Sequence, residues 1–347
     1  GWDPDWIRSE ADVRAVLHGC RFDIKAADRV RQFFAQFLRH SKGQWAGKAF
    51  ELLPWQWEGV IAPLFGWQRK DGTRRFRKAH IEVVKKSGKS TMASGISLYL
   101  LIADGEAGAE IYNAACDRSQ SSIVFNEARN MAAANPMLKR RLDIVDSRKE
   151  IHYGTSTYKA LSADVPTKEG LNTHGLIVDE LHAQKSRELW DTLVYSGAAR
   201  QQPLMTVVTT AGVYDPASIG WEQHEYARQV LDGTIEDDAF FAYMVGASPE
   251  DDWQDPAVWQ RVNPSWGVTI NPEDFAAEAK TAASTPAQEN NFRRYRLNQW
   301  VQQVTRWLPL HTWDANWPAG HAPITEEALR GRPCYGGLDL AAVSDLT

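Results

Sequence analysis

The fold of this chain is decided by the stretch Val83-Val84-Lys85-Lys86-Ser87-Gly88-Lys89-Ser90-Thr91. Residues 80–84 are typical of a strand, and residues 90–103 are typical of a helix. A strand, a short loop ending in Gly-Lys-Ser and a helix form a phosphate-binding loop, because loop and helix N–H groups point at the phosphates. We therefore expect Lys89 to reach the β- and γ-phosphates of a nucleotide and the Ser90 hydroxyl to bind Mg²⁺.

The match to the pattern Gly-x4-Gly-Lys-Ser/Thr is incomplete, since Val83 stands where the first glycine is expected. Gly-Lys-Ser alone is also compatible with a helix that begins with a lysine and a serine cap. In the nucleotide-binding interpretation, the residues around the phosphates are Lys86, Ser87, Gly88, Lys89, Ser90 and Thr91. Other motifs must decide between the two interpretations.

Two carboxylates follow a second apolar run. Residues 174–179 are predicted to form a buried parallel strand, and Asp179 and Glu180 come at its C-terminal end. Ligands of α/β sheets bind at that edge. We assign Asp179 to the support of Mg²⁺ and Glu180 to the general base that polarises the attacking water. Without the phosphate loop, the same pair would equally fit two solvated acids in a loop.

A third apolar run, residues 203–209, predicts another buried strand that ends in Thr209-Thr210-Ala211-Gly212. Small hydroxyl residues at such a strand end can contact the γ-phosphate or its water and relay the loss of that phosphate. Thr210 is therefore a further candidate catalytic residue. A plain strand end followed by a glycine turn is the alternative.

Upstream of the loop, Gln56 lies in the segment Leu52-Leu53-Pro54-Trp55-Gln56-Trp57. Its amide has one acceptor and two donors, which suits the edge of an adenine base. Trp55 or Trp57 could stack on the base, but aromatic core residues at a helix start explain the tryptophans better.

The order of elements predicts an α/β fold. The expected strands are 80–84, 110–115, 157–161, 174–179 and 203–209, and the expected helices between them are 90–103, 118–134 and 186–199. Such alternation is typical of a parallel sheet with helices on both faces. Residues 148–153 could pair with 142–145 as a hairpin, and residues 1–50 are expected to be helical. After Gly212 the expected helices lie near 221–232, 272–283 and 286–299.

These motifs, in this order, resemble the large terminase subunit of tailed bacteriophages. The segments that carry the resemblance are 53–56, 88–91, 114–120, 168–172, 179–182, 200–203, 209–212, 263–264, 297–300 and 337–340. The resemblance implies a P-loop NTPase of the RecA-like (ASCE) type that hydrolyses ATP with Mg²⁺ and drives double-stranded viral DNA into a procapsid. It also implies that Lys85 occupies the position of the family's basic residue, often arginine, near the γ-phosphate.

The resemblance further implies partners and a place of action. They are double-stranded DNA, the portal protein of the procapsid and the small terminase subunit. A homo-oligomeric ring is expected on the portal and a monomer in isolation. The place of action is the bacterial host cytoplasm, with transient docking on the procapsid.

A nuclease domain with an RNase-H-like fold follows the ATPase in this family. Residues 335–347 resemble the first strand of that nuclease, with Asp339 as its first metal ligand. A two-metal nuclease that uses Mg²⁺ or Mn²⁺ needs several carboxylates. We expect the others beyond Thr347, so that this chain is a fragment that hydrolyses ATP and does not cut DNA.

The predicted division of the chain follows from these assignments. It comprises an N-terminal helical region (1–50), the ATPase core (51–220), a lid or linker subdomain (221–313), a linker (314–333) and a truncated nuclease strand (334–347).

Two arginines are candidates for a role at the γ-phosphate or between subunits. An arginine supplied by a neighbouring subunit accelerates phosphoryl transfer by about 10³- to 10⁵-fold. Arg118 and Arg200 lie in segments that resemble the family, and both could equally be surface arginines.

The amino-acid composition limits the classes of function and the cellular environment that fit this chain. The net charge of −5 excludes a uniformly basic DNA binder. Local basic runs such as 74–78, 139–141 and 293–296 could contact DNA or face solvent.

No run of apolar residues approaches the length of a membrane span. The three cysteines do not have the spacing of metal ligands, so no zinc site is expected, and their small number favours a reducing compartment. Most of the fifteen tryptophans are expected to pack in the core, with stacking on single-stranded bases as the alternative.

Two other functions fit part of the pattern. Asp179-Glu180-Leu181-His182 has the DExH form of superfamily 2 helicases, but the sequence after residue 212 predicts no second RecA-like domain. A module that binds ATP without hydrolysing it, and holds DNA or a portal, is the other alternative. The presence of Lys89, Ser90, Asp179 and Glu180 argues against it.

Overall fold

The computed structural model describes residues 4–115, 118–161, 170–184, 187–302, 330, 331 and 333. The chain divides into two compact units, Gly1–Arg306 and Trp307–Thr347, and all helices and strands named below belong to the first. Asp339 and the predicted nuclease strand lie outside the described residues, as does nearly all of the predicted linker.

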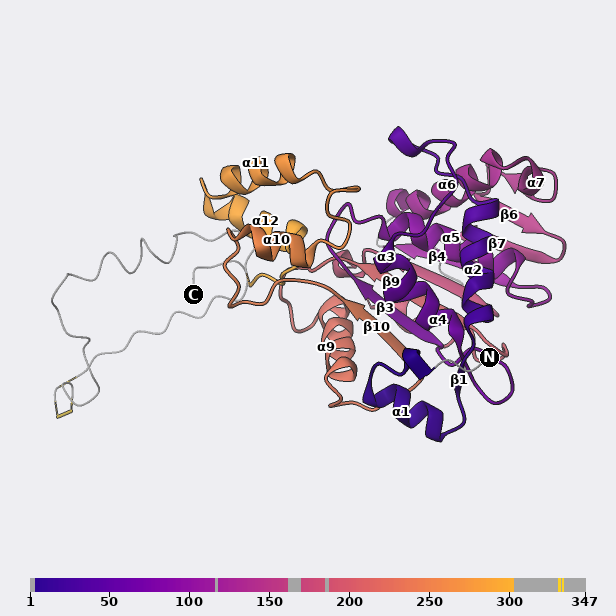
Figure 1. Cartoon of the computed structure of the whole chain (residues 1–347), viewed down its shortest axis with the longest axis horizontal. Coiled ribbons are helices and arrows are strands. Elements are labelled where there is room, and N and C mark those ends of the chain that lie inside the picture. The colour runs from indigo at the N-terminus through magenta and orange to yellow at the C-terminus, as the bar shows by residue number, and fades with distance from the viewer. Residues whose placement is uncertain are drawn as a thin grey trace. The chain divides into compact units, whose positions relative to one another are not determined.

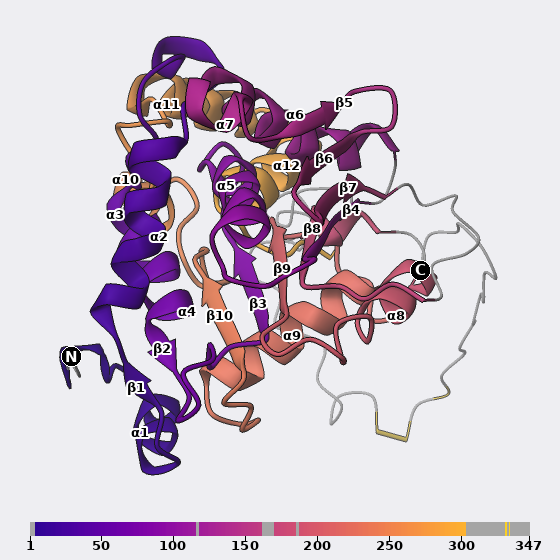
Figure 2. The same cartoon turned by 90° about the vertical axis from the view of Figure 1, so that its right-hand side faces the viewer.

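An eight-stranded sheet with the order β10-β3-β9-β8-β4-β7-β6-β5 forms the centre of the first unit (Figures 1 and 2). Its strands are β3 (Lys78–Glu82), β4 (Glu110–Ala115), β5 (Asp143–Val145), β6 (Glu150–Tyr153), β7 (Ser156–Ala160), β8 (Gly175–Asp179), β9 (Leu204–Thr209) and β10 (Phe240–Met244). The strands from β10 to β7 pair in parallel, whereas β7, β6 and β5 pair antiparallel. The predicted parallel sheet and the predicted hairpin are therefore present.

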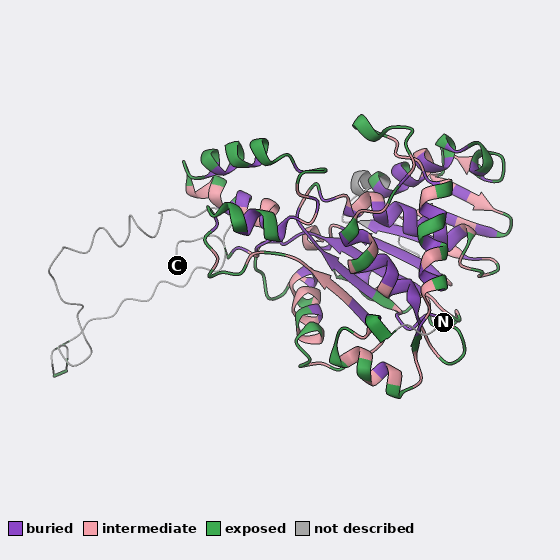
Figure 3. Ribbon diagram, viewed as in Figure 1, coloured by how far each residue is buried: buried purple, intermediate pink, exposed green. Residues whose placement is uncertain are grey.

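The central strands are buried on both faces (Figure 3), because successive side chains of a strand point to opposite sides. Ile177 of β8 joins the core cluster that contains Met92 and Ile96 of helix α5 (Lys89–Ile102). Its neighbour Leu176 joins a different cluster, with Leu189 of α8 (Glu188–Leu193) and Ile219 of α9 (Ile219–Leu231). Helices cover both faces, as the alternation of elements predicts.

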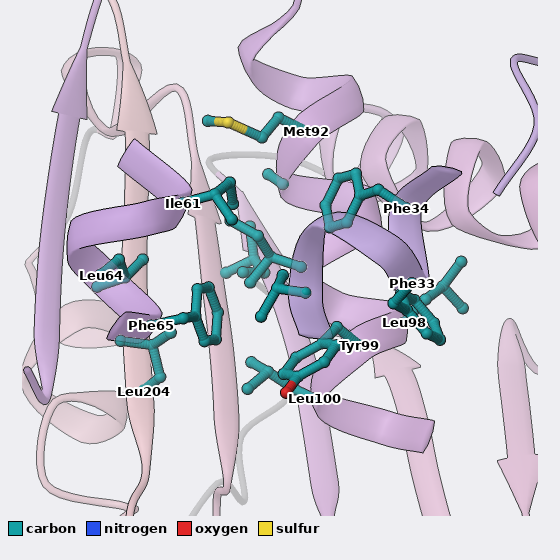
Figure 4. Close-up of a cluster of buried hydrophobic side chains, with 14 of the residues drawn as sticks. Phe33, Phe34, Ile61, Leu64, Phe65, Met92, Leu98, Tyr99, Leu100 and Leu204 are labelled. Carbon is teal, nitrogen blue, oxygen red and sulfur yellow. The ribbon is translucent and has the colours of Figure 1, made fainter. Parts of the chain in front are cut away.

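The N-terminal region is helical and packs on α5. Its elements are η1 (Pro4–Trp6), α1 (Glu10–Leu17), α2 (Ile24–Phe37), η2 (Gly43–Trp45), α3 (Pro54–Gln56), the π-helical η3 (Trp57–Ile61) and α4 (Ala62–Gly66), with a small sheet of β1 (Arg21–Phe22) and β2 (Trp67–Gln68). Figure 4 shows Phe33 and Phe34 of α2 meeting Leu98 and Tyr99 of α5. The ring centroids of Phe33 and Tyr99 lie 5.5 Å apart, edge to face. This aromatic packing fixes α2 beside the helix that follows the phosphate loop.

The close approach of α2 to α5 depends on Gly95. A Cβ at this position would lie 2.4 Å from Cε1 of Phe34 and 3.0 Å from Cδ1 of Leu38. Phe34 is fully buried against Phe50 and has little room to move. The glycine is thus required by packing although it lowers helix propensity.

We expect Gly95→Ala to destabilise the fold by about 1–2 kcal/mol, because overpacking costs about 1–3 kcal/mol and outweighs a helix-propensity gain of about 1 kcal/mol. Urea unfolding monitored by circular dichroism measures the change. The matched control is Gly95→Ala combined with Phe34→Leu, in which the shorter side chain should reduce the cost of the added methyl. A more stable single variant would contradict this packing argument.

The C-terminal part of the first unit forms its own hydrophobic cluster. Its helices are α10 (Pro256–Val262), α11 (Pro272–Ala282) and α12 (Pro286–Arg296). Phe275 and Phe292 meet edge to face, and Trp253 and Trp259 are buried with them. Val84, which follows β3, belongs to the same cluster, so the subdomain packs directly on the phosphate loop. These tryptophans are packing residues, in agreement with the expectation from the sequence.

Several predicted elements differ from those observed. The sequence analysis missed β10 and α10, and β10 is an edge strand that pairs only with β3 among the described strands. The helix expected over 186–199 is reduced to α8, which gives way to turns before Gly197. The helix expected over 286–299 ends at Arg296, because Asn298 adopts a left-handed conformation with φ of 53°. The remaining helices, α6 (Arg118–Ala134) and α7 (Pro136–Lys139), and the short η4 (Leu181–Ala183) complete the unit.

Candidate nucleotide site

The loop between β3 and α5 has the conformation that its glycine permits. Gly88 has φ of 94° and forms the N-cap of α5, a left-handed geometry that side chains other than glycine rarely adopt. Lys86 also has a positive φ, 68°. The turn directs the first residues of α5 across the C-terminal ends of β3, β8 and β9, which are neighbours in the sheet. The N–H groups at the start of α5 are thus available to an anion.

Lys89 brings three of the predicted motifs together. Its ammonium donates to Thr210 Oγ1 over 2.7 Å and pairs with Glu180 Oε1 over 3.1 Å. The side chain is only 5% exposed. The loop, the acid pair and the threonine segment therefore meet at one point although they are far apart in the sequence.

The oxygens of Ser90 and Asp179 fit a bound Mg²⁺. Ser90 Oγ donates to Asp179 Oδ1 over 3.4 Å. Burial and the neighbouring Glu180 raise the pKa of Asp179 to about 7. A divalent cation would compensate the charge of this carboxylate, and hydroxyl and carboxylate oxygens are the ligands that Mg²⁺ prefers. These two residues suit the metal position expected from the sequence.

Glu180 has the properties of a base that remains ionised. Burial would raise its pKa, but the charge and the hydrogen bond of Lys89, together with the charge of Lys85, outweigh this effect and lower the pKa below its usual value. Glu180 has φ of 53°, and its N–H donates to the carbonyl of Val208. This left-handed turn directs the side chain of Glu180 away from the path of β8.

His182 supports Glu180 from the other side. Its Nδ1 lies 3.1 Å from Glu180 Oε2 and 3.1 Å from Thr209 Oγ1. Burial lowers the pKa of His182 to about 4, with further lowering by the charges of Arg294, Lys89 and Lys85. The hydrogen bond of Nδ1 is with Thr209, and Glu180 Oε2 accepts none from the described residues, so the neutral imidazole packs against the carboxylate without adding charge.

A pocket of about 430 Å³ opens beside the phosphate loop. Its walls come from the segment between α2 and α3, from the phosphate loop and from the C-terminal subdomain. The residues that line it include His40, Trp45, Phe50, Gln56, Ser87, Gly88, Thr91, Val268 and Thr269. Gln56 Oε1 accepts from the N–H of Leu53 over 3.0 Å, which fixes the amide. Its Nε2 lies beside Gly88. The pocket is large enough for a purine base, and Gln56 lies at its boundary with the phosphate loop.

The C-terminal subdomain holds the backbone of the phosphate loop. Ser265 donates to the carbonyl of Ser87 and Thr269 to the carbonyl of Lys86, both over 2.7 Å. The N–H of Lys85 donates to the carbonyl of Tyr295 over 3.0 Å. Lys85 Nζ lies 3.5 Å from the centre of the Tyr295 ring, a cation–π contact. Burial lowers the pKa of Lys85.

Of the two candidate arginines, Arg200 is not brought to the loop of its own chain. Arg200 lies before β9, at the opposite end of the strand from Thr210, and pairs with Glu106 over 3.2 Å. It also donates to the carbonyls of Asn172 and Gly108. Strand β9 separates it from the site by about 20 Å at 3.3 Å per residue. The predicted contact between Arg200 and the nucleotide of its own chain is therefore wrong, whereas a role between subunits remains a prediction. Arg118 begins α6, and its side chain lies outside the described residues.

Asn298 and Arg294 also contact the threonine segment, although neither was a predicted site residue. Asn298 Oδ1 accepts from the N–H of Ala211 over 2.7 Å, and its Nδ2 donates to the carbonyl of Val245. Arg294 Nε donates to the carbonyl of Ala211 over 3.2 Å. Asn298 was part of a segment that resembles the family, but Arg294 was assigned to a basic run that could contact DNA. Only the fold shows that both lie against the threonine segment.

Comparison with known families agrees with this geometry. Residues 54–229 match the family described as terminase large subunit, ATPase domain. Residues 234–347 match the terminase large subunit, endonuclease domain. The chain belongs to the terminase large subunit family. The division into five parts made from the sequence remains a prediction, and β10 shows that the sheet extends beyond the predicted ATPase core.

Individual relatives agree with the family. The large terminase subunit of Enterobacteria phage HK97 is 29% identical over 328 residues, which cover 92% of this chain and 61% of that protein. The crystal structure of the HK97 large terminase superposes with a TM-score of 0.69 at 27% identity, covering 83% of this chain and 58% of that one. Protein YmfN of Escherichia coli K12 is 29% identical over 178 residues, 51% of this chain and 38% of that protein. The chain thus spans about three fifths of the length of its terminase relative.

Two further features concern residues 4–115, 118–161, 170–184 and 187–302. No helix among them is long and apolar enough to cross a membrane. Within the same residues, no group of three or more His, Cys, Asp or Glu side chains could hold a metal ion.

Proposed function

We propose that this chain is the ATP-hydrolysing part of a motor that moves double-stranded viral DNA into a procapsid. The observation that carries the proposal is the meeting of Lys89 with both Thr210 and Glu180 beside the Ser90–Asp179 pair. Family membership supports the same function, whereas neither the helicase nor the non-hydrolysing module is supported by the matches.

The side chains divide the chemistry among them. Bound Mg²⁺, held by Ser90 and Asp179, would supply charge neutralisation at the β- and γ-phosphates. Of the three N–H groups of the Lys89 ammonium, two meet Thr210 and Glu180 among the described residues, which leaves one for a phosphate oxygen. The ionised Glu180 would accept a proton from the attacking water.

A continuous set of contacts connects this chemistry with the C-terminal subdomain. Thr210 contacts Lys89, and the next residue, Ala211, is held on its N–H by Asn298 and on its carbonyl by Arg294. Trp300 donates to the buried Glu82 at the end of β3. A shift of Thr210 on hydrolysis would therefore reach α12 and the segment after it. We propose this as the path by which ATP turnover moves DNA.

The proposed partners are double-stranded DNA, the portal protein and the small terminase subunit. The motor would work as a homo-oligomeric ring on the portal, in the host cytoplasm, and the isolated chain would be a monomer. The full-length protein would also cut DNA with Mg²⁺ or Mn²⁺. Asp339, the proposed first ligand of that metal site, lies outside the described residues.

The proposal is tested by measuring ATP hydrolysis for the chain alone, with linear duplex DNA, and with DNA plus procapsids that carry the cognate portal. Turnover that rises with DNA and portal supports a packaging motor. Binding of ATP without turnover under all three conditions would favour a passive module, and strand separation of a forked duplex would favour a helicase.

We expect Gln56→Ala to reduce the preference for ATP over GTP by about fivefold or more, because one hydrogen bond to the base contributes about 1 kcal/mol. Competition of each nucleotide against a fluorescent ATP analogue gives the ratio of dissociation constants. Gln44→Ala is the control, since Gln44 is exposed in η2 and does not line the pocket. An unchanged ATP to GTP ratio would assign Gln56 to the turn that it caps.

A further inference from the structure

We propose that Arg294 of α12 is a catalytic arginine that contacts the γ-phosphate of the ATP bound by its own chain. The inference rests on the proposed function and adds to it a residue that none of the predicted motifs contains. It also makes the C-terminal subdomain part of the active site.

The position of Arg294 follows from a short series of contacts. Lys89 Nζ donates to Thr210, and Arg294 Nε donates to the carbonyl of the next residue, Ala211, over 3.2 Å. The carbonyl of the next residue, Tyr295, accepts from the N–H of Lys85 in the phosphate loop. Arg294 and Tyr295 together thus contact the threonine segment and the loop, the two parts of the chain that meet at Lys89.

The charge around Arg294 suits an anion. Lys85 lies 3.5 Å and the Arg294 guanidinium 4.6 Å from the centre of the same Tyr295 ring. Lys89 adds a third cation, and Glu180 is the acid that contacts it. The same three positive charges act together on His182. Lys85 follows β3, Lys89 begins α5 and Arg294 contacts the segment that follows β9, so three positive charges lie near the ends of these strands and suit the charge of a triphosphate.

Arg294 differs from the other arginines of its helix. Arg293 pairs with Glu289 over 2.8 Å, and Arg296 pairs with Glu278 over 2.7 Å. Within the described part of the chain, Arg294 forms no ion pair with a carboxylate, and only its Nε–H donates to a protein oxygen. The four N–H groups on its two terminal nitrogens remain for a ligand, and their planar fork matches two phosphate oxygens.

An arginine in this position would also sense the nucleotide. The subdomain that carries α12 holds the loop through Ser265 and Thr269. Loss of the γ-phosphate would remove the anion from Arg294 while these loop contacts remain. Arg294 would then be the group through which α12 distinguishes ATP from ADP.

The test compares Arg294→Ala with Arg293→Ala, which removes a neighbouring arginine that pairs with Glu289 on the same helix. We expect Arg294→Ala to lower kcat by about 10²-fold or more, as removal of a preorganised transition-state donor does. Affinity for a non-hydrolysable fluorescent ATP analogue should fall, whereas ADP affinity should stay within about twofold because ADP lacks the contacted group. Arg293→Ala should change neither quantity.

Two outcomes would overturn the inference: wild-type kcat in Arg294→Ala, or an equal loss of affinity for ADP and the ATP analogue, which would make Arg294 a packing residue. A mixing experiment, carried out on procapsids that carry the portal so that the subunits assemble, tests whether it acts within one chain. The Lys89→Ala variant cannot hydrolyse ATP itself but still carries Arg294. If mixing it with the Arg294→Ala variant restored turnover, Arg294 would act on the ATP of a neighbouring subunit. If the wild-type chain binds nucleotide but does not hydrolyse it, the proposed function fails, and the comparison of ATP analogue with ADP still tests the contact.

Discussion

Replacement of Lys89 by alanine is expected to reduce ATP turnover by about 10³-fold, the upper range for loss of one charge aimed at a transition state. The ammonium contributes twice. It would contact the phosphates directly, and it holds Thr210 and Glu180 in place. Its charge also opposes the effect of burial on the pKa of Glu180, so the general base should become harder to ionise in the variant.

Steady-state phosphate release measures this effect, and circular dichroism confirms that the variant is folded. Lys78→Ala is the matched control, because Lys78 is an exposed lysine at the opposite end of β3. A folded Lys89→Ala variant that hydrolyses ATP at the rate of the control would disprove the phosphate-loop assignment.

Glu180→Gln is expected to keep ATP binding and to slow hydrolysis by about 10²- to 10⁴-fold, the contribution of a positioned general base. The amide has nearly the same shape, and its single oxygen can still accept from Lys89 while its NH2 group lies beside Nδ1 of the neutral His182, so the geometry of the site should survive. It cannot take the proton of the attacking water at neutral pH.

Single-turnover hydrolysis and nucleotide affinity, measured on the same preparation, separate the two properties. Glu222→Gln provides the control, since Glu222 is a half-exposed acid that pairs with Arg187, the residue that precedes α8. Wild-type hydrolysis in Glu180→Gln would show that another group activates the water.

The structural features that are determined by residues close together in the chain could be predicted from the sequence. The strand, loop and helix around Lys89 follow from local periodicity and from a glycine with a left-handed φ. The acid pair at the end of β8 and the threonines at the end of β9 follow because parallel strands place their C-terminal ends at one edge. The antiparallel pairing of β5 with β6 was predictable for the same local reason.

Features that depend on contacts between distant segments required the tertiary structure. Arg200 and Arg294 both stood in segments of basic or family-like character, and nothing local distinguishes them. The fold places Arg200 at the far end of β9 against Glu106, and it places Arg294 against Ala211 beside the phosphate loop. The edge strand β10 was missed because its position beside β3 is determined by long-range pairing and not by its own pattern. The sequence by itself thus determined the phosphate loop and its acids, whereas only the packing of the C-terminal subdomain decided which arginine lies against the threonine segment, because that contact joins residues far apart in the sequence.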